Sequence, residues 1–490
     1  MDNKTIMQYF EWYLPNDGLF WKRCEAKAKE IKESGIDGLW LPPAYKGASG
    51  RRSVGYDVYD TYDLGEFNQK GAIRTKYGTR EEYLSAVRAL QSSGVEVYTD
   101  IVLNHMMGAD DVEDVVVEKT AETNREKVIS GKLGIKTWTK FNFKKRNGKY
   151  STFTWNHTHF SGTDWDEKRK HRAIYRFYGK KWHKQTDKEN VNYDYLMGAN
   201  IDYNNEESVK AVTDWGKWYY DTVKMDGFRL DAVKHIGISF YKKWLKEVRE
   251  HIGENLFAVG EYWSGELSTL LHYLDEIDNS LSLFDVPLHY AFFKAATSDG
   301  KVDLSKLFED TLVKERPANA VTFVDNHDTQ PGQALESFVP EWFKQTAYSI
   351  ILLRKDGIPC VFYGDYYGIP HDKIAPVLGL KKLLKVRKKY AYGEQIDYFD
   401  DPSLVGFTRQ GDSEHKNSGI AVLFTDMEAG KKRMNVGKTF AGERFYDVLS
   451  NVTEYVTIDE DGFGEFKVAD GSVSVWIRAK AYEDIILSVE

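Results

Sequence analysis

Short apolar runs that end in polar or charged residues recur between residues 6 and 365. Uninterrupted apolar runs of this length are typical of strands that are buried on both faces of a parallel sheet. Helical patterns lie between most of them, for example Tyr241–Ile252, which Gly253 would end. Eight alternating strand and helix units predict an α/β fold, a parallel (β/α)₈ TIM barrel. The eight runs are Ile6–Trp12, Gly38–Pro43, Val95–His105, Gly227–Asp231, Phe257–Glu261, Leu281–Pro287, Val321–Asp328 and Ile358–Asp365.

The connection between the third run and the fourth is much longer than the others. Residues 106–204 are polar and rich in Lys, Asn, Trp and Tyr, and a structureless loop of that length is not expected in a compact protein. We therefore predict a small, irregular β-rich domain over residues 106–204, inserted into a barrel domain that comprises residues 1–105 and 205–394.

The pattern changes again after residue 394. Short alternating strands separated by Gly, Asp and Asn predict a C-terminal all-β sandwich domain over residues 395–490. Its clearest strands are Leu404–Thr408, Ile420–Thr425 and Val473–Ile477.

The composition limits the classes of partner. The 490 residues carry a formal net charge of −8, so no basic face for nucleic acid is expected. No window approaches the roughly 18 apolar residues that a membrane-spanning helix needs. Residues 1–10 lack the charged and apolar regions of a signal peptide, so we expect a cytoplasmic protein, or a secreted one whose signal peptide has been removed. We also expect a monomer.

The two cysteines and one basic run have simple structural interpretations. Cys24 and Cys360 are too few for a disulfide framework, and each lies in a segment predicted to pack in the barrel. We expect two buried thiols. The basic run from Lys144 to Arg146 is predicted to be a solvated loop.

Three acidic residues occupy predicted strand ends: Asp231, Glu261 and Asp328. In a (β/α)₈ barrel the reactive groups lie at the C-terminal ends of the strands. A single acid at such a position could simply cap the following helix. Three of them, each among further polar residues, indicate an active site, because burying a carboxylate is costly unless it has partners or a role.

The neighbours of two of these acids suggest different protonation states. Arg229 lies two residues before Asp231 on the same strand face, and its guanidinium would keep Asp231 ionised. Glu261 follows an apolar strand and precedes Tyr262 and Trp263, so apolar walls and nearby acids would raise its pKa. An ionised nucleophile facing a protonated acid is the arrangement that glycoside hydrolysis with retention requires.

Four segments resemble the signature regions of the α-amylase family, glycoside hydrolase family 13. They are DIVLNH (Asp100–His105), GFRLDAVKH (Gly227–His235), VGEYW (Val259–Trp263) and FVDNHDT (Phe323–Thr329). Three further segments look closest to the bacterial liquefying type: LPPAYKG (Leu41–Gly47), GYDVYDTYDLGEF (Gly55–Phe67) and NYDYLMGANIDY (Asn192–Tyr203). The resemblance covers nearly the whole chain. It implies hydrolysis of internal α-1,4 bonds in starch, glycogen and maltodextrins.

The resemblance also implies a role for each site residue. Asp231 would be the nucleophile, Glu261 the acid/base, and Asp328 the residue that stabilises the transition state. Arg229 would orient Asp231, Tyr56 would stack on the sugar ring at the cleavage site, and Lys234 and Trp263 would line the leaving-group side. The sugar hydroxyls around the scissile bond would be bound by His105, His235 and His327.

The family commonly binds calcium between the barrel and the inserted domain. Residues matching its ligands here are Asn104, Asp194 and the backbone carbonyl of His235, while Asp202 is also retained. The liquefying relatives place acids where this chain has Ser161, His183 and Asn200. Calcium needs six to eight oxygens and its affinity rises with ligand charge. We therefore predict one weakened calcium site at most, with sodium or no metal as alternatives, unless Asp187 or Asp164 compensates.

Other functions are compatible with parts of this pattern. Another enzyme of the same family could form particular oligosaccharides, debranch or transglycosylate with the same carboxylates. A catalytically inactive glucan-binding or scaffold protein could share the fold, but such relatives lose catalytic carboxylates that this chain keeps. An unrelated barrel enzyme could use the acids to bind a metal, but no set of histidine ligands accompanies them.

Overall fold

Eight parallel strands close into a barrel in the order β1-β16-β15-β14-β13-β12-β5-β2. The structure is a computed structural model that describes residues 3–489. Every predicted run contains one barrel strand, so the fold prediction is confirmed. Each strand stops before its run does, so the last residues of each run lie beyond the strand, at the C-terminal rim of the barrel. The barrel strands are β1 (Ile6–Gln8), β2 (Gly38–Leu41), β5 (Glu96–Ile101), β12 (Gly227–Leu230), β13 (Phe257–Gly260), β14 (Ser282–Phe284), β15 (Ala320–Phe323) and β16 (Ile358–Phe362).

Helices connect the strands around the outside of the barrel. The predicted helix at 241–252 is α4, which buries Tyr241, Trp244, Leu245 and Val248 on one face and ends at Gly253 with φ +80°. The helices up to residue 389 are α1 (Phe20–Glu33), α2 (Arg80–Ser92), α3 (Glu206–Val223), α4 (Ile238–Ile252), α5 (Leu267–Glu276), α6 (Val286–Thr297), α7 (Leu312–Glu315), α8 (Glu341–Leu353), α9 (Tyr363–Tyr367) and α10 (Leu380–Lys389). No helix in the described part of the chain is long and apolar enough to cross a membrane.

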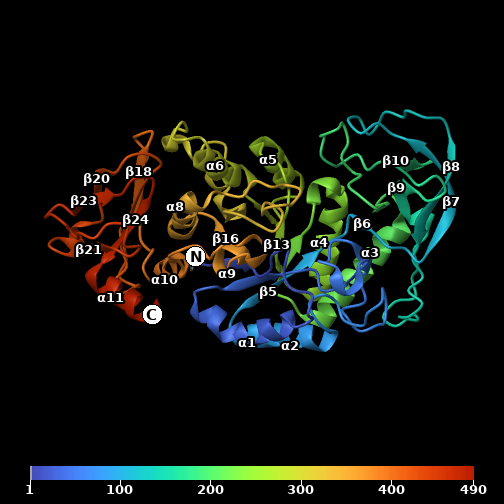
Figure 1. Ribbon diagram of the computed structural model, residues 1–490, viewed down its shortest axis with the longest axis horizontal. Coiled ribbons are helices and arrows are strands. Elements are labelled where there is room, and N and C mark those ends of the chain that lie inside the picture. Colours follow the sequence, from blue (N-terminus) through green and yellow to red (C-terminus); the bar gives the residue numbers. More distant parts are fainter. Residues whose placement is uncertain (1–2, 490) are drawn as a thin grey trace.

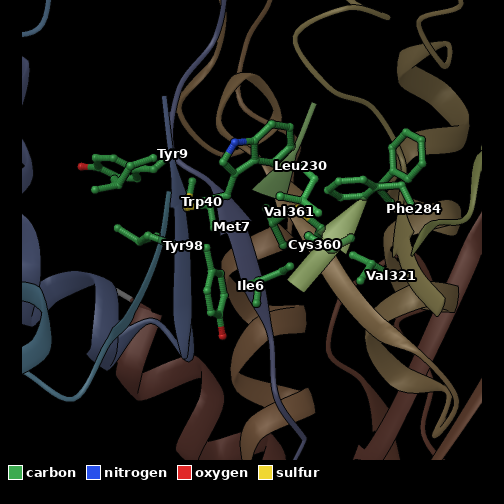
Figure 2. Close-up of a cluster of buried hydrophobic side chains, with 14 of the residues drawn as sticks. Ile6, Met7, Tyr9, Trp40, Tyr98, Leu230, Phe284, Val321, Cys360 and Val361 are labelled. Carbon is green, nitrogen blue, oxygen red and sulfur yellow. The ribbon is translucent and has the colours of Figure 1, made fainter. Parts of the chain in front are cut away.

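Side chains from several strands fill the barrel (Figure 2). Ile6, Leu230, Val321 and Cys360 come from four different strands and are each almost completely buried. Cys24, on α1, is likewise a buried free thiol, as expected. Burial raises the pKa of Cys360 to about 12, so neither the position nor the protonation state of this thiol suits a nucleophile.

The inserted segment forms a six-stranded sheet at one end of the molecule (Figure 1), in the order β6-β11-β9-β10-β7-β8. Buried and exposed residues alternate along β8, as expected for a sheet with one face in water. The strands are β6 (His105–Met106), β7 (Asp111–Lys119), β8 (Leu133–Lys140), β9 (Phe160–Asp166), β10 (His171–Phe177) and β11 (Ala199–Ile201), and a short hairpin of β3 (Lys46–Gly47) and β4 (Val58–Asp60) lies beside them in the barrel domain.

The prediction of a solvated loop at residues 144–146 is wrong for Arg146. Lys144 and Lys145 are exposed, but Arg146 is buried, and its Nε donates a 2.8 Å hydrogen bond to Asp60 on β4. The run is basic, but only its first two residues are on the surface. The buried pair instead ties the inserted domain to the barrel domain.

The C-terminal segment packs at the opposite end of the barrel from the inserted sheet (Figure 1). It contains a six-stranded sheet in the order β17-β18-β19-β24-β21-β22, and β20 and β23 pair as a second sheet. Residues from both sheets, including Leu423, Met434 and Phe466, share one buried core, so the sandwich prediction is confirmed. The strands are β17 (Gln395–Tyr398), β18 (Leu404–Arg409), β19 (Ile420–Thr425), β20 (Gly430–Asn435), β21 (Arg444–Asp447), β22 (Val456–Thr457), β23 (Phe463–Val468) and β24 (Val473–Arg478).

The C-terminal domain is not all-β, because it ends in helix α11 (Ala479–Val489). Ala481 and Ile485 lie four residues apart, one turn of helix, and both are completely buried. This apolar pair packs the helix against the domain, but two positions are too few to predict a helix from the sequence.

Candidate active site

The guanidinium of Arg229, completely buried in β12, lies at the centre of the rim. One terminal nitrogen donates to Asp231 Oδ1 at 2.7 Å and the other to Glu261 Oε2 at 2.6 Å. Because the two acceptors share one rigid planar group, they are held within about 8 Å of each other. The structure thus brings together the three residues that the sequence placed on two neighbouring strands, β12 and β13.

Asp100 completes this arrangement and was not among the predicted site residues. Its Oδ1 accepts a 2.9 Å hydrogen bond from Arg229, and its Oδ2 accepts from Tyr56 and from the indole of Trp40. Burial raises the pKa of Asp100, and the negative charge of Asp231 adds to the effect, while Arg229 opposes it. The signal was present in the sequence: an aspartate within the predicted strand run Val95–His105, which the structure buries over Val97–Ile101.

Glu261 has the electrostatics of a proton donor at neutral pH. Burial raises its pKa to about 8, against the opposing effect of Arg229, and the charges of Asp231 and Asp328 raise it further. The backbone N–H of Ala232 donates a 3.1 Å hydrogen bond to the oxygen that also faces Arg229. The expectation that apolar walls and nearby acids raise the pKa of this glutamate is confirmed.

Asp328 faces the same centre from the loop after β15. Its backbone N–H donates to the side chain of Asn326 at 2.8 Å, which fixes the turn that carries the carboxylate. About 24 % of its side chain is exposed to solvent, yet its partial burial raises its pKa to about 6, while Arg229 opposes this rise. His327 Nε2 lies 3.5 Å from its Oδ2.

Aromatic rings form one wall of the site. The ring of Tyr56 is nearly parallel to His327 at a centroid distance of 5.0 Å and to Trp12 at 6.1 Å. The Tyr56 hydroxyl donates to Asp100 at 2.8 Å, so the ring is held rigidly beside the carboxylates. A flat wall of this kind can stack on a sugar ring. Trp12 was not predicted, because it lies beyond the end of β1 without a recognisable motif.

His105 and His327 lie near the carboxylates of Asp231 and Asp328, His235 lies against Tyr193, and all three are held as neutral rings. Burial lowers the pKa of His105, and it lowers those of His235 and His327 to about 3. His105 Nε2 contacts the backbone oxygen of Tyr56 at 2.8 Å, and His235 Nδ1 contacts that of Tyr193 at 2.7 Å. Neutral imidazoles in fixed orientations suit hydrogen bonding to hydroxyls rather than charge pairing.

Lys234 and Trp263 lie together on one side of the carboxylates. Lys234 Nζ donates to the Trp263 carbonyl at 3.0 Å and to Glu189 Oε2 at 2.7 Å. Glu189 belongs to the inserted domain, and the neighbouring Asp187 N–H donates to the Lys234 carbonyl at 2.9 Å. The inserted domain therefore shapes this side of the site, which the sequence did not reveal because the contact joins residues about 45 positions apart.

The predicted metal residues converge between the barrel and the inserted domain. Asn104 Nδ2 lies 3.4 Å from the Asp194 carbonyl and 3.3 Å from the His235 carbonyl. The side chain of Asn200 contacts Asp194 and Ser161, and its Oδ1 is buried without a partner.

The acids near these residues contact other side chains. Asp202 pairs with Lys180 at 2.7 Å, Asp164 pairs with Arg172 at 3.0 Å, and Asp187 bonds to Tyr262. Within residues 3–489, no group of three or more His, Cys, Asp or Glu side chains could hold a metal ion.

Comparison with known proteins identifies this arrangement. The family model for the α-amylase catalytic domain matches residues 25–397, and the model for the α-amylase C-terminal domain matches residues 421–477. The chain belongs to the α-amylase family.

Several curated α-amylases are similar over almost the whole chain. The α-amylase of Geobacillus stearothermophilus is 52% identical, with 98% of this chain and 87% of the relative covered. The glucan 1,4-alpha-maltohexaosidase of Bacillus sp. strain 707 is 49% identical, with 97% and 92% covered. The cytoplasmic α-amylase of Escherichia coli K12 is 40% identical, with 97% and 99% covered.

Solved structures agree on the fold. The structure of an α-amylase from Geobacillus thermoleovorans in complex with acarbose has a TM-score of 0.64 and 18% identity, with 97% of this chain and 98% of that one covered. As an α-amylase family glycoside hydrolase, the chain hydrolyses α-1,4-glucosidic bonds in α-glucans.

Proposed function

We propose that the chain is an endo-acting α-amylase that cleaves internal α-1,4 bonds by double displacement with retention. The observation that carries this proposal is the single guanidinium of Arg229 bonded to both Asp231 and Glu261. Such a clamp holds a carboxylate nucleophile and a protonated acid on two sides of one small space, as retention requires. The raised pKa of Glu261, about 8, supports its role as the acid.

The first displacement forms a covalent intermediate. The Glu261 carboxyl proton passes to the glycosidic oxygen as the bond from that oxygen to the anomeric carbon breaks. An Asp231 carboxylate oxygen then forms a bond to the anomeric carbon from the opposite face.

The second displacement releases the sugar. The Glu261 carboxylate takes a proton from water, whose oxygen bonds to the anomeric carbon as the bond to Asp231 breaks. Two inversions restore the α configuration. Asp328, and the ionised Asp231 before it reacts, stabilise the positive charge that develops on the sugar ring.

The remaining residues bind the glucan. Tyr56 stacks on the ring at the cleavage site, supported by its parallel packing with His327 and its hydrogen bond to Asp100. His105, His235 and His327 bind hydroxyls, and Lys234 and Trp263 bind the sugar that leaves. The hydrogen bond between Lys234 and Glu189 supports the assignment of Lys234 to the leaving-group side, because it places a polar residue of the inserted domain beside that part of the site.

A single cation, calcium or sodium, would be held by Asn104, Asn200, Asp194 and the carbonyl of His235. When bound, it would join the inserted domain to the barrel and supply no reacting group. The exchange of three acids for Ser161, His183 and Asn200 removes negative charge from the region, which supports weak binding.

We further propose a monomeric, cytoplasmic protein, with secretion after removal of a signal peptide as the alternative. The name of the E. coli relative, cytoplasmic α-amylase, supports the first location. The barrel domain would comprise residues 1–105 and 205–394, the inserted domain residues 106–204 and the C-terminal domain residues 395–490.

A second candidate is an enzyme that releases one preferred oligosaccharide, as the name of the maltohexaosidase relative suggests for that protein. Digestion of soluble starch by the wild type and by Glu261→Gln, followed by chromatography at short times, separates the two. We expect a broad range of product lengths from the wild type and almost none from the variant. A single dominant product from the first minutes would contradict endo action.

A further inference from the structure

A buried lysine lies beneath the loop that carries Asp328. Lys344, in the first turn of α8, is 2 % exposed, and its Nζ lies 2.9 Å from Asp325 Oδ2 and also pairs with Asp365 Oδ1. Asp325 follows β15 and Asp365 follows β16, so one ammonium joins two neighbouring strand ends at the catalytic rim. Both carboxylates are buried as well.

Stability alone is a poor reason for such a cluster. A cation in the first turn of a helix opposes the helix dipole. Buried ionic groups lose their hydration, and apolar residues of similar size often stabilise a protein as well or better. The interior here also contains two carboxyl groups for one ammonium. What the cluster does provide is a fixed geometry, because each carboxylate is held by direct bonds.

Those bonds lead from Lys344 to the Asp328 loop. Asp325 Oδ1 accepts a 2.8 Å hydrogen bond from Thr329 Oγ1, which in turn accepts a 3.0 Å bond from the N–H of Asn326. The side-chain oxygen of Asn326 accepts from the N–H groups of Asp328 and Thr329 at 2.8 and 2.9 Å. Residues 325–329 thus form a connected set of hydrogen bonds centred on the Asp325 carboxylate, which is held by Lys344 and by the N–H of Val339.

We propose that Lys344 is a positioning residue for catalysis, which fixes Asp325 and through it the loop that presents Asp328 to the substrate. The inference rests on the proposed role of Asp328. Because Asp328 contributes most when positive charge develops on the sugar, a small displacement weakens transition-state binding more than ground-state binding. The effect therefore falls on kcat and leaves KM nearly unchanged.

The test compares two buried cations replaced by methionine. Lys344→Met removes the ammonium and leaves an unbranched side chain that is one heavy atom shorter. Arg387→Met is the matched control, since Arg387 is buried on α10 and bonds to Lys4 and Thr5 near the start of β1, at the opposite end of the barrel. Thermal unfolding and circular dichroism give the folded fraction of each variant. Kinetics use a maltooligosaccharide of defined length, with acarbose as an inhibitor that resembles the transition state.

We expect Lys344→Met to lower kcat by about 30- to 100-fold per folded molecule, change KM less than about 3-fold, and weaken acarbose binding by a factor similar to the loss in kcat. Arg387→Met should unfold at a lower temperature yet keep kcat within about 2-fold. A Lys344→Met protein with the wild-type kcat, or with KM and kcat shifted without any change in acarbose affinity, would overturn the proposal.

Two further variants keep the test decisive. If Lys344→Met does not fold, Thr329→Val removes the hydroxyl that joins Asp325 to Asn326 with almost no change in shape, and it should show the same pattern at about 5- to 20-fold. A folded Thr329→Val with unchanged kcat would overturn the inference in that case. Asp328→Asn separates the positioning role of Lys344 from the proposed role of Asp328. If Asp328→Asn is inactive while Lys344→Met and Thr329→Val are fully active, only the positioning role of Lys344 is wrong. If Asp328→Asn keeps its activity, the proposed role of Asp328 is wrong.

Discussion

Arg229, on β12, donates a 2.7 Å hydrogen bond to Asp231, which lies two residues further along the chain, just after the strand ends. The same guanidinium reaches Asp100 and Glu261, so one side chain orients three carboxylates. This fork geometry requires a planar group with several donors, which arginine has and lysine lacks.

Arg229→Lys should therefore lower kcat strongly while it keeps a positive charge. We expect a loss of about 100- to 1,000-fold, because lysine cannot bond to Asp231 and Glu261 at once in the same plane. Steady-state kinetics on soluble starch measure this, with circular dichroism to check folding. A loss of less than about 5-fold would mean that charge alone, and not the clamp, orients the nucleophile.

The activity should decline at alkaline pH because Glu261 must carry a proton to act as the acid. With a pKa of about 8, kcat/KM should fall about tenfold per pH unit above that value. A profile that stays flat to pH 10 would contradict the assignment of Glu261.

The same raised pKa predicts how stability depends on pH. Folding raises the pKa of Glu261 from 4.5 to about 8, so between these values the folded chain keeps a proton that the unfolded chain has released. The contribution to stability is complete below pH 4.5 and is lost as the pH rises through 8. Urea unfolding should show that Glu261→Gln gains stability relative to the wild type across this range. A constant difference between the two proteins would contradict the raised pKa.

Removal of divalent metal should have little effect on the wild type. With Ser161, His183 and Asn200 in place of acids, we expect EDTA to lower Tm by less than about 3 °C. Asn200→Asp restores a charge beside Asp194 and should make Tm rise with added calcium, whereas Asn204→Asp provides a control at a neighbouring, more exposed position. A wild-type Tm that falls by more than about 10 °C on chelation would show that the site is strong.

Arg146 should contribute to the free energy of unfolding, whereas its exposed neighbours Lys144 and Lys145 should not. Arg146→Met leaves Asp60 buried without its cation, which costs about 3–5 kcal/mol, while Lys145→Met changes an exposed side chain and should have little effect. Urea unfolding of both variants measures the difference. Equal stabilities would mean that Asp60 finds another partner or a proton.

The sequence was sufficient for the barrel and for the residues at its rim. Buried parallel strands form continuous apolar runs, and Asp231, Glu261 and Asp328 end three of these runs, so their place at the rim could be predicted without a structure. The resemblance supplied the residues on the loops, such as Tyr56 and Lys234.

Residues whose importance depends on distant partners could not be found in this way. Glu189 contacts Lys234 only because the inserted domain packs against the barrel. Arg146 belongs to a basic run that resembles a surface loop in the sequence, and only the structure shows its bond to Asp60. Lys344 occupies an ordinary helical position and gains its significance from two carboxylates on other elements. These contacts depend on tertiary packing, so they cannot be predicted from the local sequence pattern.

The configuration of the first product tests the central claim most directly. Proton NMR during the early digestion of a maltooligosaccharide, before mutarotation, shows whether each new reducing end is α or β. A nucleophilic Asp231 opposite a proton-donating Glu261 predicts that the α-anomer appears first and the β-anomer grows in only as mutarotation proceeds. Release of the β-anomer first would contradict the double displacement.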